Sequence, residues 1–103
     1  MGGSGFLGAW VARFLHINQC LARIFDPNKP DSEWHRLSGI RADATDWAAG
    51  DVSKKFELDD AIRDCEGVIN LAGLLTPQCS QNPVRGAEVN LIGAINVFEV
   101  ALN

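Results

Sequence analysis

The sequence predicts an α/β fold with a parallel sheet. Two observations lead to this prediction: a glycine-rich run at residues 2–8 passes directly into an amphipathic helix, and helical and short apolar segments alternate along the rest of the chain. With 103 residues, 47% of them hydrophobic and 21% charged, the chain can bury one modest core. We expect one domain, or part of one, over residues 1–103.

Charge and cysteine content argue against several classes of protein. The net charge is −4 and the nine Lys and Arg residues are scattered, which argues against a nucleic-acid surface. The three cysteines form no C-x-x-C pair and lie near no histidine cluster, so neither a disulfide framework nor a metal site is indicated. No secretory signal or membrane-length apolar stretch is recognisable. We expect a cytoplasmic protein without a membrane or nucleic-acid partner.

The glycine-rich run is the first candidate site. Gly2, Gly5 and Gly8 are spaced three apart at the start of the predicted helix. Glycine reaches positive φ without a Cβ penalty, so the run can turn sharply and leave backbone N–H groups free for a pyrophosphate. We assign the tight turn to Gly2, the close approach to phosphate to Gly5, and the packing of the helix on the sheet to Gly8. By itself, such a run is more often an ordinary loop.

A helix, a strand and an acidic residue follow the glycines. A helix is predicted from Phe6 to about His16, with a buried face made of the apolar residues Leu7, Val11, Phe14 and Leu15. Residues 20–25 are a short apolar run closed by Asp-Pro-Asn, which is typical of a buried parallel strand.

Asp26, at the end of that strand, is the second candidate. It lies 18 residues after Gly8, close to the offset of about 20 residues at which dinucleotide-binding folds place an acid on the adenosine ribose. Its carboxylate can accept hydrogen bonds from both ribose hydroxyls and would repel a 2′-phosphate, so NAD is favoured over NADP. The alternative is that Asp26 is simply a turn residue before Pro27.

Further elements are predicted along the rest of the chain. They are a short helix over residues 31–37, a strand over 45–49, a helix over 53–65 capped by Ser53, a strand over 68–72, and a long helix over 83–102. The expected buried face of the last helix consists of Val84, Ala87, Leu91, Ile95, Phe98 and Leu102. Ala72 and Gly73 are the third candidate, because small residues at a strand's carboxyl end let a flat ring approach the backbone.

Five motifs in order now point to a family. They are Gly-Gly-Ser-Gly-Phe-Leu-Gly at 2–8, Asp26, Gly-Asp-Val at 50–52, Asn-Leu-Ala-Gly at 70–73 and Glu-Val-Asn-Leu-Ile-Gly at 88–93. Together they resemble the extended short-chain dehydrogenase/reductases, the group of NAD-dependent epimerases and dehydratases. The resemblance covers nearly the whole chain but only the amino-terminal third of a typical member. It implies a Rossmann-like sheet that binds NAD.

The resemblance also implies a role for each matching residue. It places Gly2, Gly5, Phe6, Leu7 and Gly8 around the pyrophosphate, Asp26 on the ribose, Asp51 and Val52 at the adenine edge, Leu71, Ala72 and Gly73 beside the nicotinamide, and Asn90 in support of a proton relay. Periodicity alone would make Asp51 a turn or capping residue and Asn90 a solvent-facing polar residue.

Two departures from the family limit these assignments. Its members have a hydrophobic strand before the glycines, usually ending in Thr, where this chain has Met1. The family's Tyr-x-x-x-Lys pair would fall beyond residue 103, and the sequence contains no tyrosine. We therefore expect a fold that lacks its first strand and its carboxyl-terminal part, with either an open slot or a non-family pairing between residues 20–25 and 68–72.

The predicted function follows from the resemblance. The chain is interpreted as the NAD-binding portion of an epimerase, dehydratase or related oxidoreductase that transfers hydride, with a sugar nucleotide or similar small molecule as substrate and a homodimeric full-length homologue. On its own it is expected to be inactive. Two alternatives stay open: a non-catalytic nucleotide-binding module, and an inactive truncated product.

Overall fold

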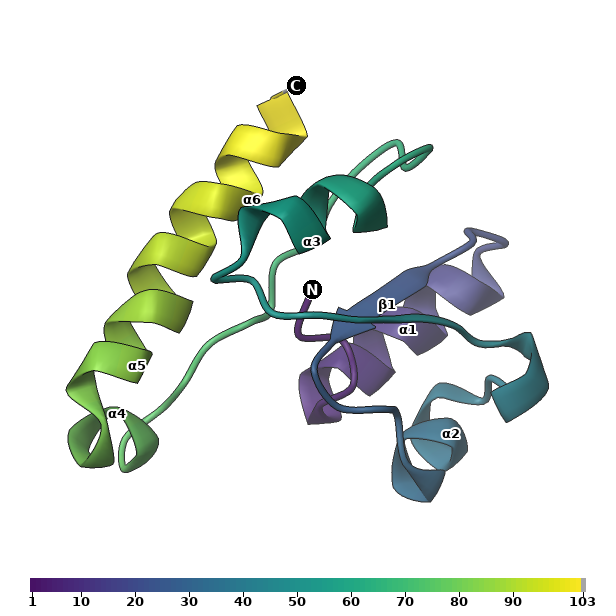
Figure 1. Cartoon of the computed structure of the whole chain (residues 1–103). Helices are drawn as coiled ribbons and strands as arrows, with labels where there is room; N and C mark the ends of the chain where they lie inside the picture. The colour runs from purple at the N-terminus through teal and green to yellow at the C-terminus, as the bar shows by residue number, and fades with distance from the viewer. Residues whose placement is uncertain (103) are drawn as a thin grey trace.

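A computed structural model describes residues 1–102 (Figure 1). Its elements are, in order, α1 (Phe6–Ile17), β1 (Arg23–Asp26), α2 (Ser32–Ser38), the short 3₁₀ helix η1 (Ala42–Ala44), β2 (Asp46–Ala49), α3 (Lys55–Ala61), α4 (Gln78–Gln81), α5 (Pro83–Ala87), the π-helical turn η2 (Glu88–Ile92) and α6 (Gly93–Leu102). The strands β1 and β2 are parallel, with Arg23 opposite Asp46 and Asp26 opposite Ala49. The predicted α/β fold is confirmed as a partial doubly wound sheet.

Helices cover both faces of this small sheet. Figure 1 shows α1 and α2 on one side of β1, with α3 and the long helix formed by α5, η2 and α6 on the other. The neighbouring residues Ile24 and Phe25 of β1 point to opposite faces and are 5% and 3% exposed. Ile24 packs in a cluster with Ala9, Ala12 and Trp34, and Phe25 packs in a second cluster with Val52, Leu58, Ala61, Val89, Val97 and Val100. One strand therefore joins two cores.

In both long helices the buried face is not the predicted one, and its side chains are smaller than those of the predicted face. Helix α1 buries Gly8, Ala9 and Ala12, and α6 buries Gly93, Val97 and Val100. The large apolar residues lie outward, among them Phe14 at 65% and Phe98 at 71% exposed. A Cβ on Gly93 would lie 2.6 Å from Cγ2 of Val52, so the missing side chain lets the helix approach closely. Periodicity identifies apolar faces but does not choose between two of them.

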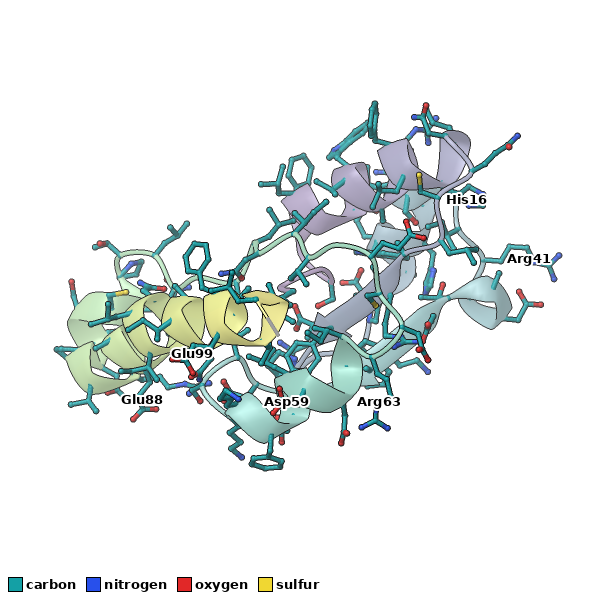
Figure 2. The ribbon with its side chains drawn as sticks, turned by 90° about the horizontal axis from the view of Figure 1, so that it is seen from above. His16, Arg41, Asp59, Arg63, Glu88 and Glu99 are labelled. Carbon is teal, nitrogen blue, oxygen red and sulfur yellow. The ribbon has the colours of Figure 1, made fainter. Side chains whose placement is uncertain are left out.

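Other predicted boundaries shift because side chains have partners that the sequence does not show. Strand β1 starts at Arg23 rather than residue 20, and Leu21 before it is fully exposed. Ser53 does not cap α3: its amide and its hydroxyl both donate to Oδ1 of Asp51, each at 2.9 Å, and the helix starts after Lys54. It ends at Ala61, where the carbonyl accepts a hydrogen bond from Arg23. The charged side chains of Asp59 and Arg63 point away from the sheet (Figure 2).

Residues 68–72 form no strand, which corrects the third predicted strand. The Met1 ammonium donates to the Ile69 carbonyl at 2.7 Å, and the Leu71 N–H donates to the Met1 carbonyl at 2.8 Å. On its other side, the Gly2 N–H donates to the Phe25 carbonyl at 2.8 Å. The two hydrogen bonds between Met1 and residues 69–71 have the pattern of a parallel ladder that is one residue long. Met1 thus lies in line with the expected first strand, and the hydrogen-bonded sheet within residues 1–102 has two strands.

Candidate functional site

The glycine-rich loop has a sharply turned backbone. Gly2 has a φ of +69°, and a Cβ there would lie 2.6 Å from the Ala72 nitrogen, so the turn at Gly2 requires glycine. The contact with the sheet is made by Gly3, where a Cβ would lie 2.9 Å from Cγ2 of Ile24. Gly8 does not pack on the sheet as predicted, because a Cβ there would overlap the Gly3 carbonyl. It lets helix α1 pack on its own loop.

The start of α1 is free to receive an anion. Gly5 is the N-cap, and no side chain caps the first turn. A Cβ on Gly5 would meet only the Gly2 carbonyl, at 3.9 Å, so the space in front of it is open. Phe6 and Leu7, which follow, are 72% and 59% exposed. The unpaired N–H groups and the helix dipole together favour a phosphate at this position.

Asp26 lies beside this loop, although its side chain is turned inward. The residue is 8% exposed, and its Oδ2 accepts a hydrogen bond from the Ser4 N–H at 3.3 Å. Its Oδ1 accepts from the Asn28 N–H at 2.9 Å, which is the contact of a turn residue. A carboxylate has about four lone-pair positions, so both contacts leave capacity for hydroxyl donors. Sequence spacing did not point to Ser4, whose amide links Asp26 to the loop.

Asp51 is tied to the long helix by an ion pair. Its Oδ2 lies 2.6 Å from Nη2 of Arg85, and Arg85 also reaches Oε2 of Glu88 at 3.2 Å. Burial raises the pKa of Asp51, but hydrogen bonds from Ser53 and Arg85 outweigh it and hold that pKa below its usual range. Sequence analysis missed Arg85. A cation in the first turn of a helix opposes the dipole, and that misfit signals an acidic partner.

Val52 is a core residue. It is 5% exposed and packs against Gly93, and its carbonyl accepts a hydrogen bond from Nδ2 of Asn96 at 2.9 Å. Its side chain is therefore not available to a nucleotide at the adenine edge.

Asn90 holds the turn that follows Gly73. Its Oδ1 accepts from the Leu74 N–H at 2.7 Å, and its Nδ2 donates to the Leu74 carbonyl at 2.9 Å. The same nitrogen lies 3.4 Å from the sulfur of Cys79. Asn90 belongs to η2, and π-helical turns of this kind are frequent at functional sites. Both ends of the amide are therefore used to order the backbone beside Gly73.

The predicted residues fall into two groups. The glycine loop contacts Ala72 through Gly2 and Asp26 through Ser4, so these parts are brought together. Asp51 is instead bound to Arg85 of the long helix, and Asn90 lies on that helix and holds Leu74. A cavity of about 350 Å³ lies between β1, β2 and α3, and none of the predicted cofactor residues lines it. Within residues 1–102, the candidate site is thus an open surface at the carboxyl ends of the strands.

Comparison with known proteins identifies the family. The sequence model of the 3-beta hydroxysteroid dehydrogenase/isomerase family matches residues 1–103. The chain belongs to this family. The resemblance to NAD-dependent epimerases and dehydratases is confirmed by relatives of the same kind: a UDP-glucose 4-epimerase of Rickettsia typhi is 31% identical over 108 residues, covering 99% of this chain and 31% of the epimerase.

Two further matches describe the fold and the extent of the chain. The crystal structure of Thermus thermophilus UDP-glucose 4-epimerase, a complex with NAD, superposes with a TM-score of 0.76 at 23% identity, over 96% of this chain and 31% of that one. An uncharacterized membrane protein of Methanocaldococcus jannaschii is 29% identical over 104 residues, again 31% of its length. This member of the family thus spans about a third of its relatives.

The label of the archaeal relative raises the question of membrane insertion. Among residues 1–102, no helix combines the length and apolar character needed to cross a bilayer.

Proposed function

We propose that this chain is the NAD-binding part of an epimerase, dehydratase or related oxidoreductase. One observation carries the proposal: the uncapped start of α1 lies next to the Asp26 carboxylate, and the Ser4 amide joins the two. A dinucleotide needs both an anion site for its pyrophosphate and an acceptor for its ribose hydroxyls, at a short separation. The Thermus relative, whose fold this chain shares, was solved with NAD.

Each part of the site has a physical task in this proposal. The N–H groups of Phe6 and Leu7 and the α1 dipole stabilise the pyrophosphate, and Gly5 leaves room for it. Asp26 accepts hydrogen bonds from the ribose and disfavours NADP by charge repulsion. When bound, NAD would supply the hydride acceptor or donor. Asn90 fixes the backbone after Gly73, beside which the nicotinamide would lie.

The substrate we propose is a small alcohol or ketone such as a sugar nucleotide. Three of the curated relatives are named UDP-glucose 4-epimerase, which supports that class.

The cofactor experiment changes Asp26. We expect the wild-type chain to bind NAD at least about tenfold more tightly than NADP, and Asp26→Ser to bring the two dissociation constants within a few-fold of each other. Isothermal titration calorimetry with both nucleotides gives the ratio. Asp43→Ser is the matched control, because it removes the same charge from an exposed position and should leave the ratio unchanged. An unchanged ratio of dissociation constants in Asp26→Ser would show that Asp26 does not contact the ribose. If the wild type bound neither nucleotide, the proposal would be rejected.

A second experiment tests net oxidation of a substrate, in which the hydride stays on the nicotinamide. Residues 1–103 contain no tyrosine, and an asparagine amide such as that of Asn90 does not titrate near neutral pH. We expect this chain by itself to produce no NADH from sugar nucleotides or simple alcohols above a protein-free control. NADH absorbance at 340 nm measures it, and steady production would show that other groups serve as acid and base.

A further inference from the structure

A single peptide unit connects the glycine loop to two other elements. The carbonyl of Gly3 accepts a hydrogen bond from the indole N–H of Trp34 at 2.6 Å. The N–H of the same peptide, which belongs to Ser4, donates to Oδ2 of Asp26 at 3.3 Å. Because a trans peptide is planar and its C=O and N–H point in opposite directions, fixing one end orients the other. The Gly3–Ser4 peptide is therefore fixed from both sides.

Trp34 is a rigid donor. It is 2% exposed and packs with Ala9, Ala12 and Ile24 beneath the loop. Helix α2 holds its backbone, because the carboxylate of Asp31 caps the helix by accepting from the Trp34 N–H at 2.9 Å. The Gly3 carbonyl that it contacts is buried against Gly8. Without the indole N–H, that carbonyl would be left unpaired in the interior, which is unfavourable.

We propose that Trp34 is a positioning residue of the nucleotide site, which sets the Asp26 carboxylate against the glycine loop through the Gly3–Ser4 peptide. This inference rests on the proposed function and deepens it. Holding the Gly3 carbonyl inward turns the Ser4 N–H toward Asp26. If the peptide rotated to expose that carbonyl, the Ser4 N–H would leave Asp26 and a partial negative charge would turn toward the pyrophosphate position.

The inference predicts which ligands are affected. ADP-ribose spans both the pyrophosphate and the ribose positions, so it depends on the spacing that the peptide sets. Adenosine carries the ribose without the pyrophosphate, so it depends on Asp26 but not on the loop. Loss of the Trp34 hydrogen bond should weaken ADP-ribose selectively, whereas a general loss of structure would weaken both ligands together.

The experiment compares Trp34→Phe with Trp10→Phe. The first keeps a buried aromatic ring and removes the N–H. The second makes the same change on the outer face of α1, where Trp10 is 46% exposed. Binding of ADP-ribose and of adenosine is measured by calorimetry at a temperature at which circular dichroism shows each variant folded. We expect Trp34→Phe to weaken ADP-ribose about tenfold and adenosine less than about threefold, and Trp10→Phe to change neither.

A second measurement on the wild-type chain covers the case in which Trp34→Phe does not fold. We expect the indole N–H of Trp34 to exchange slowly with solvent and its NMR resonance to shift on addition of ADP-ribose but not of adenosine. Equal losses for both ligands, no loss, or an indole resonance that ADP-ribose leaves in place would each overturn the inference. If the wild type binds ADP-ribose and only these results fail, the proposed function stands. If it binds neither ADP-ribose nor NAD, both fall.

Discussion

Strand β1 and residues 68–72 are two short apolar segments that face each other across the same gap, and only one of them is a strand. In β1, Ile24 and Phe25 are 5% and 3% exposed, whereas Ile69 is 48% exposed. The difference lies in the partners: β1 has β2 along its outer edge, and residues 68–72 have Met1 alone at their inner edge. Backbone pairing, more than composition, decides which apolar segment becomes a strand.

The largest expected effect comes from supplying a partner to both segments at once. We expect five aliphatic residues added before Met1 to continue the one-residue ladder and turn residues 68–72 into a strand. Each buried aliphatic side chain contributes about 1.5–3 kcal/mol and each ordered residue costs about 1.5 kcal/mol, so a net gain on the order of 4 kcal/mol is expected. Urea unfolding measures it, with a Gly-Ser extension of equal length as control. Equal gains from both extensions would contradict it.

The same extension should change the pH dependence of stability. Burial lowers the pKa of the Met1 ammonium, and the nearby Asp26 partly opposes this. The unfolded chain therefore holds that proton more tightly than the folded chain does. As a result, the free energy of unfolding increases as the pH rises toward 8.0, the ordinary pKa of this group, and decreases as the pH is lowered. Moving the ammonium away from this site should flatten that slope. Urea unfolding at pH 6 and pH 8.5, with and without the extension, tests this, and equal slopes would count against it.

A smaller effect is expected from breaking the contact between residues 68–72 and the loop. Gly2→Ala places a Cβ 2.6 Å from the Ala72 nitrogen at a φ of +69°, and we expect a loss of about 2–4 kcal/mol. Amide hydrogen exchange should rise at Leu71 and much less in β1. Gly67→Ala is the control, because nothing lies within 4 Å of a Cβ there. Equal loss of protection in both segments would mean that they unfold as one unit.

The smallest effect concerns the Asp51–Arg85 ion pair, which ties the loop after β2 to the long helix. The folded pKa of Asp51 lies below 3.8, so its stabilising contacts are present above about pH 4 and are lost as the pH falls. With side chains 20% and 35% exposed, the pair is worth about 1 kcal/mol. Arg85→Met should lower the free energy of unfolding by that amount at pH 7. It should also make the loss of stability below about pH 4 smaller. Arg41→Met, which breaks the exposed pair with Asp43, should leave both unchanged.

Local sequence patterns predicted the positions of helices and strands better than they predicted which residues those elements contact. The helix expected over residues 6–16 is α1, and the strand expected over 45–49 is β2, because apolar spacing and turn residues act within a few residues. The strand predicted over residues 68–72 does not form, because a strand needs a neighbouring strand and no local pattern shows whether one is present. The prediction that Ser53 caps a helix is wrong because its hydroxyl donates a hydrogen bond to Asp51, two residues earlier.

The same limit applies to the candidate site. Glycine spacing predicted the tight turn at Gly2, because positive φ is a property of a single residue. The contacts that bind the parts together join residues far apart in the chain, such as Trp34 with Gly3 and Arg85 with Asp51. Spacing along the sequence does not identify the two members of such a pair, so the pairs became visible only in the folded chain.

The π-helical turn η2 has a consequence for chain length. A π turn holds one residue more than an α turn, and each residue of an α-helix adds about 100° of rotation. Deleting one residue between Glu88 and Ile92 would therefore rotate α6 by about 100° relative to α5. Gly93 could then no longer face Val52 while Asn90 faces Leu74. A single insertion or deletion in this stretch of a relative would thus prevent the last helix from packing on Val52 and holding the turn after Gly73 at the same time.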